Sequence, residues 1–255
     1  KKKDSISGGA EEATTEKKHK AISFFNNIKS KINARLGKTT AQGEKVLGIE
    51  LTAKEIRLAE VNLKDNSCSL ENLYLHKIEL PEDATVLDNL DLLTDQLKLA
   101  LQDSKIKTNN VAFSIPVTSA IIRVVTCPVM SDEELTAATE TGTLWENLVQ
   151  LTDNLNDYSI LHQVISRNEK ENTMDILFVA SKLSDINSYS SIIRESGLNP
   201  AIIDVKCFSI KTAVDQASKL SSQQEDPSLT AILEFGTDEN YVMILHENNP
   251  IITDI

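Results

Sequence analysis

Two segments of the chain place an acidic residue and a polar turn between two apolar runs. The first is "VLGIELTAKEIRLAEV", residues 46–61, in which Glu50 precedes the turn. The second is "AILEFGTDENYVMILHE", residues 231–247, in which Glu234 precedes the turn and Gly236 lies in it. Carboxylates hold hydrated magnesium, and glycine lets backbone amides approach a phosphate group. The two turns are therefore treated as candidate phosphate loops, although both carry Glu and the first contains no glycine.

Other chemistry has little support in the sequence. There is no GxSxG, GxxxxGK[ST] or HExxH motif, and no CxxC or HxxxH spacing. The three cysteines and four histidines are scattered: Cys68, Cys127, Cys207, His19, His76, His162 and His246. We therefore predict neither a disulfide framework nor a metal site. The same cysteine pattern predicts a reducing compartment.

Charge is distributed unevenly along the 255 residues, whose formal net charge is −12. Residues 1–45 contain 11 Lys and Arg against 5 Asp and Glu, and the remainder contains 15 against 33. The head is therefore basic and the body acidic. An acidic body with 4% aromatic residues argues against a nucleic-acid partner, which requires clustered Lys and Arg.

Alternating strand and helix patterns after residue 45 must position the candidate loops, and they predict an α/β fold. Strands are expected within residues 46–61, 67–81, 109–116, 120–130, 157–165, 173–182, 200–205 and 229–255. Helices are expected within residues 85–104, 131–151, 184–198 and 206–218.

Local signals give these helices their ends. Ser131 and Glu134 form a capping-box pattern, and Gly142 is expected to interrupt the helix that follows. Ser184 is the expected cap of the next helix and Gly197 its stop. Trp145 is expected in a core.

Together with the paired hairpins, three further segments resemble the PilM family, actin-like proteins of the bacterial type IV pilus inner-membrane platform. They are "VAFSIPVTSAIIRVVTCPVMSDEEL", "LWENLVQLTDNLNDYSILHQVI" and "ILFVASKLSDINSYSSIIRESGLNPAIIDVKCFSI". The likeness extends from about residue 46 to the C-terminus. GspL cytoplasmic domains of type II secretion and the division protein FtsA are related to this family.

The resemblance implies an α/β, actin-like (ribonuclease H-like) first domain with an inserted small subdomain and a partial second domain. The expected division is 1–45 basic tail with an amphipathic helix; 46–116 and 173–220 first domain; 117–172 inserted subdomain; 221–228 linker; 229–255 start of the second domain. Chains of this family continue beyond the hairpin with which this sequence ends.

Against the family pattern, both loops look degenerate. The expected Asp is Glu50 in the first loop, followed by Leu51 and Thr52, and Glu234 in the second, followed by Gly236 and Thr237. A longer acidic side chain displaces a metal shell, and a branched side chain blocks close approach of a phosphate. We therefore expect no cofactor; binding of ATP and magnesium is disfavoured, and so is enzymatic activity.

The segment "AISFFNNIKSKINARLG" of the head has a helical apolar stripe with basic residues on other faces. Phe25, Ile28 and Ile32 form the stripe, and Lys29 and Arg35 flank it. The alternatives are a helix packed on the body and a helix that contacts anionic lipid or a partner.

The expected function is that of a non-catalytic adaptor of a type IV pilus, or related type II secretion, platform in the bacterial cytoplasm, peripheral to the inner membrane. The resemblance implies a groove beside the inserted subdomain that binds the cytoplasmic tail of a PilN-like bitopic inner-membrane protein, with other platform or motor proteins as partners. The alternatives are a nucleotide-gated actin-like ATP-binding protein and an FtsA-like membrane-anchored division protein.

Overall fold

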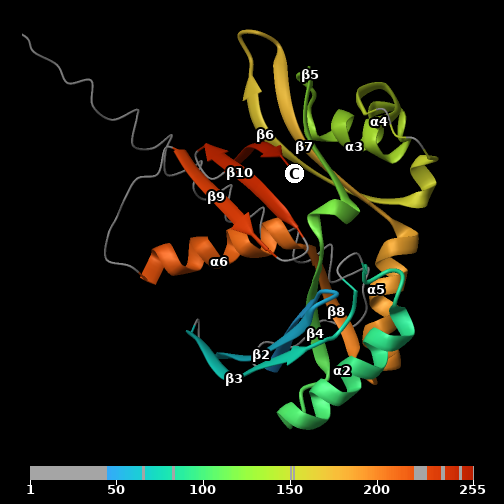
Figure 1. Ribbon diagram of the computed structural model, residues 1–255. Coiled ribbons are helices and arrows are strands. Elements are labelled where there is room, and N and C mark those ends of the chain that lie inside the picture. Colours follow the sequence, from blue (N-terminus) through green and yellow to red (C-terminus); the bar gives the residue numbers. More distant parts are fainter. Residues whose placement is uncertain are drawn as a thin grey trace, which may run out of the picture.

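The described part of the protein is organised around three β-sheets, as the computed structural model shows (Figure 1). The structure describes residues 45–64, 67–81, 84–149, 151, 153–220, 229–236, 239–246 and 249–254. Within these residues no helix is long and apolar enough to cross a bilayer.

The largest sheet has five strands in the order β3-β2-β1-β4-β8. Their bounds are β1 Lys45–Leu51, β2 Glu55–Lys64, β3 Ser67–Lys77, β4 Asn110–Ile115 and β8 Asn199–Val205. β1, β4 and β8 run parallel, and β2 and β3 extend the sheet as antiparallel strands. Parallel strands require crossover helices, which explains the strand and helix alternation of the sequence.

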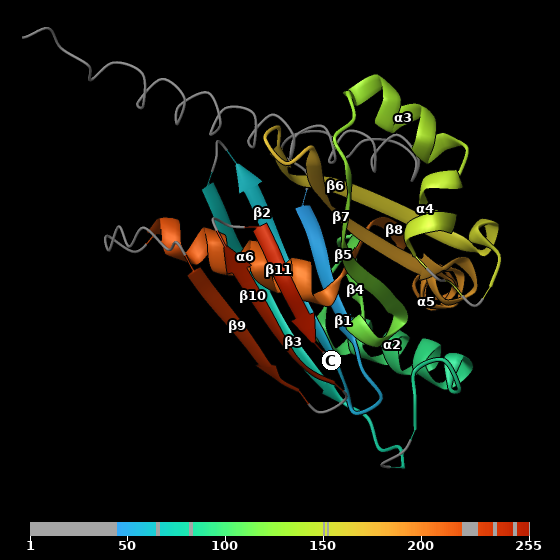
Figure 2. The same ribbon diagram turned by 90° about the horizontal axis from the view of Figure 1, so that it is seen from above.

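Helices cover the two faces of this sheet (Figures 1 and 2). α2 (Leu90–Ser104) and α5 (Leu183–Glu195) contact each other on one face, and α6 (Lys206–Leu220) packs against β4 and β8 from the other. Leu47, Leu58 and Leu93 are fully buried in the core between the sheet and α2. Their burial follows from alternate residues of a strand facing one side.

A second sheet, with the order β5-β7-β6, has its own core. It consists of β5 (Ala120–Pro128), β6 (Tyr158–Asn168) and β7 (Thr173–Lys182), accompanied by α3 (Asp132–Glu140) and α4 (Thr143–Leu148). The short 3-10 helices η1 (Val117–Ser119) and η2 (Leu155–Asp157) precede β5 and β6. Trp145 is buried there against Phe178, with 5.0 Å between ring centroids, so its predicted core role is confirmed.

The third sheet, β11-β10-β9, closes the described chain. Its strands are β9 (Leu229–Phe235), β10 (Asn240–His246) and β11 (Asn249–Asp254). Ile232 and Met243 face inward and join the core of the five-stranded sheet. The β9–β10 hairpin is therefore packed against the same body as the β1–β2 hairpin.

Several local predictions are confirmed. Ser131 and Glu134 form the capping box of α3, and Gly142, with φ 75°, separates α3 from α4. Gly197 follows α5 with φ 85°, a left-handed conformation that glycine adopts without steric cost.

Two predicted helix starts are wrong. The expected helix over 85–104 begins at Leu90, because Leu87 lies in the preceding turn and is exposed. α5 begins at Leu183 with Lys182 at the N-cap, and the Ser184 hydroxyl bonds to the side chain of Asp185 instead of capping the helix. The amphipathic stretch of the head, the linker 221–228 and Thr237 lie outside the described residues.

Candidate functional site

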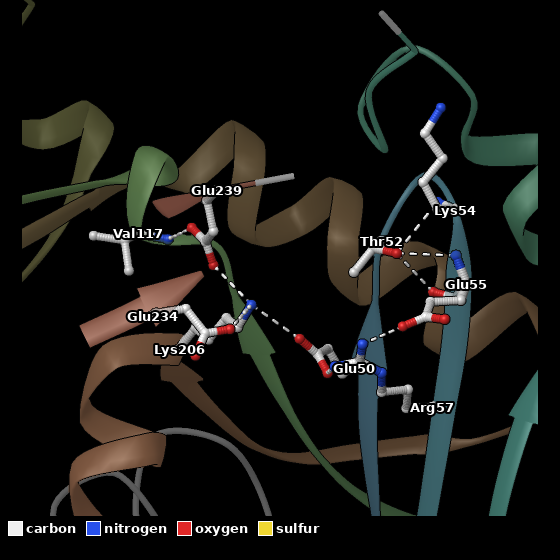
Figure 3. Close-up of polar contacts among 9 residues, drawn as sticks. All are labelled: Glu50, Thr52, Lys54, Glu55, Arg57, Val117, Lys206, Glu234 and Glu239. Carbon is white, nitrogen blue, oxygen red and sulfur yellow. Dashed lines mark hydrogen bonds and ion pairs between the residues drawn. The ribbon is translucent and has the colours of Figure 1, made fainter. Parts of the chain in front are cut away.

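The two candidate phosphate loops meet at one ammonium group (Figure 3). Lys206, the first residue of α6, places its Nζ atom 3.1 Å from Glu50 Oε1 at the end of β1. The same Nζ lies 3.3 Å from Glu234 Oε1 near the end of β9. An internal cation therefore joins the acidic residues of both hairpins.

A third carboxylate, that of Glu239, completes this group. Its Oε1 lies 3.3 Å from Lys206 Nζ, and its Oε2 accepts a 2.7 Å hydrogen bond from the backbone N–H of Val117. Glu239 precedes β10, and Val117 opens η1 directly after β4. The side chain of Glu239 is only 3% exposed, so it ties the second hairpin to the five-stranded sheet inside the protein.

Arg57 on β2 extends the network to the first hairpin. Its Nη1 donates a 2.8 Å hydrogen bond to Glu50 Oε2, and its Nη2 pairs with Glu55. We call Glu50, Glu55, Arg57, Lys206, Glu234 and Glu239 the cleft cluster. It contains two cations and four carboxylates, so its formal charge is negative.

Electrostatics keep Lys206 protonated in this half-buried place. Burial by itself lowers the pKa of Lys206, but the hydrogen bond and charge of Glu50, with the charges of Glu239 and Glu234, outweigh it. The net result is a pKa above the ordinary value of 10.5. The ammonium is therefore a permanent charge at physiological pH.

The remaining predicted loop residues have structural roles in their own turns. Thr52 Oγ1 accepts hydrogen bonds from the backbone N–H groups of Lys54 and Glu55 and donates one to the carbonyl of Glu55. The N–H of Gly236 bonds to the carbonyl of Glu239 at 3.0 Å. A Cβ at position 236 would lie 2.7 Å from that carbonyl oxygen, so the turn requires glycine.

These residues do not fit a magnesium triphosphate. Phosphate binding requires free amides or cations, whereas the Lys206 ammonium is already surrounded by three carboxylates at 3.1 to 3.3 Å. The described residues also contain no group of His, Cys, Asp or Glu side chains arranged to hold a metal ion. A triphosphate would meet the negative charge of the cleft cluster.

The structure brings the predicted residues Glu50 and Glu234 to one cation. Sequence reasoning missed the other members of the cluster, which are Lys206, Glu239 and Arg57. Lys206 stands where β8 ends and α6 begins, and the carboxyl ends of parallel strands are where α/β proteins place functional side chains. That position was the available signal. The sequence contains no comparable signal for Glu239, because acidic residues are common in polar turns.

The second region of interest lies where the β5-β7-β6 sheet meets the body. β7 is the central strand, so β5 and β6 are both edge strands of that sheet. A pocket of about 100 Å³ lies between these strands and α5. Its lining comprises Thr118, Ser119, Ala120, Ile121, Tyr158, Ala180, Lys182 and Asp185.

Comparison with known proteins gives a family match by sequence and several similar solved structures. The sequence matches the family model of the type IV pilus assembly protein PilM over residues 48–253. A chain in the solved "PilM-PilN type IV pilus biogenesis complex" is similar with a TM-score of 0.63 and 18% identity. That match covers 82% of this chain and 60% of that chain.

A Bacteroides thetaiotaomicron protein with an actin-like ATPase fold and unknown function is also similar, with a TM-score of 0.42 and 11% identity. The match covers 86% of this chain and 72% of that one. The search of curated protein sequences returns no match.

Proposed function

Since this chain belongs to the family of the type IV pilus assembly protein PilM, we propose that it is a non-catalytic adaptor of an inner-membrane pilus, or related type II secretion, platform. Its α/β fold is actin-like, as expected for the family. The similar solved chain belongs to a PilM-PilN complex, and this chain spans 60% of its length. That complex is the observation that carries the proposal.

The partner in this proposal is the cytoplasmic tail of a PilN-like bitopic inner-membrane protein. We place its docking site at the junction of the β5-β7-β6 sheet with α5. Edge strands offer unpaired backbone groups to an extended peptide, and the pocket beside Tyr158 and Lys182 offers room for a side chain. The acidic body would attract a basic segment of the tail.

The domain division is part of the same proposal. Residues 46–116 and 173–220 form the first domain, 117–172 the inserted subdomain and 229–255 the start of the second domain. The separate core around Trp145 supports an inserted unit, because a subdomain requires its own buried apolar cluster. The docking site then lies between the inserted subdomain and the first domain.

The cleft cluster supports a non-enzymatic role. In an actin-like ATPase the two hairpins bind a nucleotide between them, whereas here Lys206 joins Glu50 to Glu234 directly. We propose that the hairpins are held by this internal ion pair without nucleotide. The adaptor then presents its docking site constantly and does not switch on ATP.

We place the protein at the cytoplasmic face of the inner membrane, where the tail of a bitopic partner would hold it. The head, with 11 Lys and Arg in residues 1–45, would add attraction to anionic lipid. Anionic vesicles are then expected to recover the full chain more efficiently than a form without residues 1–44. Equal recovery would remove membrane contact from the proposal.

Site-directed cross-linking tests the docking site. In a Cys68→Ser background, single cysteines replace Val124 on β5, Leu161 on β6 or Leu233 on β9, all exposed aliphatic positions. A bifunctional reagent on the partner tail is expected to link to positions 124 and 161. Links confined to position 233 would contradict the assignment.

A further inference from the structure

One half of the five-stranded sheet carries exposed leucines on the face opposite α2. Leu70, Leu73 and Leu75 on the edge strand β3 are 59%, 73% and 47% exposed. Such a row of large apolar side chains on one strand is unusual for a solvent-exposed surface of a soluble protein. Its position and neighbours indicate what covers it.

The orientation of the row follows from the contacts of the intervening residues. Tyr74 and His76 point toward α2, where they bond to Asp103 at 3.5 Å and to Gln96 at 2.7 Å. Alternate residues of a strand face opposite sides, so Leu73 and Leu75 point away from α2. The bulge in the β2–β3 pairing near Glu60 places Leu70 on the same side as these two.

The neighbouring strands continue this face with small or apolar residues. Leu70 pairs with Val61 and Leu73 with Ala59 on β2, and Ala59 in turn pairs with Gly48 on β1. Among the described residues, only Ala59 has atoms within 4 Å of a Cβ built at Gly48, so none of the others covers this part of the face. We call Gly48, Ala59, Val61, Leu70, Leu73 and Leu75 the β3 face.

α6 covers a different part of the same side of the sheet. It contacts β4 and β8 and runs from there across the sheet toward β2 and β3 (Figures 1 and 2). The exposure of Leu70, Leu73 and Leu75 shows that α6 still leaves these β3 side chains uncovered, so a further helix could pack on them.

We propose that the amphipathic segment at residues 22–36 of the head docks as a helix on the β3 face of its own chain. The apolar stripe of this segment, Phe25, Ile28 and Ile32 with Ile22 and Leu36, would cover the three leucines, and its basic residues would face solvent. The proposal is independent of the partner and of the nucleotide question.

Chain geometry brings this segment to the β3 face. The head joins β1 at Lys45, which pairs with Asn62, and its Nζ forms an ion pair with Glu71, next to Leu70. The head therefore meets the body at the Leu70 end of the face. Residues 37–44 span up to about 28 Å when extended, which is more than enough to turn back onto β3.

The dimensions and the charges agree as well. A helix over residues 22–36 is about 22 Å long, and the strand from Leu70 to Leu75 covers about 17 Å. The head has 11 cationic and 5 acidic residues, and the body has 15 cationic and 33 acidic residues, so the two attract each other. Docking in this way would hide the apolar stripe from lipid, so membrane contact and docking exclude each other.

Photo-cross-linking in dilute solution without lipid tests the proposal. The photoreactive residue p-benzoylphenylalanine replaces Leu73, or in the matched control Leu161, which is 51% exposed on β6. Because a tethered segment has an effective concentration of about 1 mM, links within one chain should dominate at a protein concentration of about 1 μM.

We expect the Leu73 variant to link to peptides from residues 22–36 in the monomer, with a yield that does not change on tenfold dilution and is about tenfold above that of the Leu161 variant. The double substitution Phe25→Asp and Ile28→Asp should abolish these links without touching the folded body. Links that fall with dilution would identify a second copy as the occupant and overturn the proposal. Equal yields at both positions, or no link to the head, would also overturn it.

Discussion

At the scale of single residues, Lys206 decides how the two hairpins are held. Its ammonium is 13% exposed and stands within 3.3 Å of three carboxylates that come from β1, β9 and the turn before β10. Buried charges are stable only when they are paired, because desolvation is costly. Lys206 and the glutamates therefore depend on each other, and removing the cation leaves three carboxylates in mutual repulsion.

Replacing Lys206 by Met should lower the free energy of unfolding by about 3 kcal/mol, the range found when one partner of a buried ion pair is removed. Urea denaturation of the full chain gives this number. Lys98→Met is the matched control, because the side chain of Lys98 is 46% exposed and its ion pair with Asp95, at 3.2 Å, lies at the surface. The control should change stability by less than about 0.5 kcal/mol. Equal effects of both substitutions would contradict the importance of the cluster.

The stability difference between wild type and Lys206→Met should also depend on pH. The folded protein raises the pKa of Lys206 above 10.5, so below pH 10.5 the residue is protonated in both the folded and the unfolded states. Its stabilising contribution is complete there and is lost as the pH rises through the folded pKa. The difference should be equal at pH 7 and pH 9 and shrink above about pH 10.5. A difference that halves between pH 7 and pH 9 would argue against this.

Cys207, the neighbour of Lys206, should be chemically silent in the folded protein. Burial, with the charge of Asp204, raises the pKa of the Cys207 thiol to about 12, and the residue is 1% exposed. Thiol reagents react with the thiolate, so labelling at pH 8 should require unfolding. Mass spectrometry after labelling in buffer and in urea measures the difference. Modification of Cys207 in buffer at the urea rate would show that α6 opens easily.

At the scale of elements, the sequence predicts those helix ends that a few consecutive residues determine. The capping box at Ser131 and the break at Gly142 could be read directly, because each depends on a few consecutive residues. The first residues of α2 and α5 could not be predicted in this way. Leu87 fits the helical spacing but lies in a turn, and Ser184 is a good cap residue that the chain leaves inside the helix. Helix ends are the least predictable part of an element, because a spacing pattern or a good cap residue also fits positions one turn away.

The β9–β10 turn should be sensitive to any side chain at Gly236. A Cβ there would lie 2.7 Å from the carbonyl oxygen of Glu239, so Gly236→Ala must move the residue that ties the hairpin to Val117. We expect a loss of about 1–3 kcal/mol, as for overpacked sites.

Gly48→Ala is the control for this substitution, because its Cβ would meet its nearest atom at 3.5 Å, an ordinary contact. That variant should be neutral or more stable by about 0.5 kcal/mol, since alanine reduces the entropy of the unfolded chain. Thermal melting compares the two. A Gly236→Ala variant as stable as Gly48→Ala would show that the turn is not tightly constrained.

At the scale of the whole molecule, the alternation of strands and helices was sufficient to predict an α/β fold, and the resemblance to the PilM family added the actin-like arrangement. The candidate site was only half predictable. Glu50 and Glu234 were found as a pair, but the cation between them comes from α6, about 156 positions after Glu50 and 28 before Glu234. The position of Lys206 at the start of α6 marks a place for a functional side chain, but nothing in the sequence connects it with these two glutamates.

The charge of the molecule supports the proposed function at the same scale. An acidic body and a basic head attract each other, so the head has two competing surfaces, its own β3 face and an anionic membrane. A partner tail that reaches the β5-β7-β6 junction would bring the protein to the membrane and shift this competition toward lipid.

Calorimetric titration of the full chain with ATP in the presence of magnesium tests the central claim most directly. If Lys206 replaces the nucleotide in joining the two hairpins, no saturable heat should be seen up to about 1 mM ATP, which corresponds to a binding free energy weaker than about −4 kcal/mol. Saturable binding with a micromolar dissociation constant, abolished by Gly236→Val, would contradict the claim, because it would show that the hairpins still form a nucleotide site.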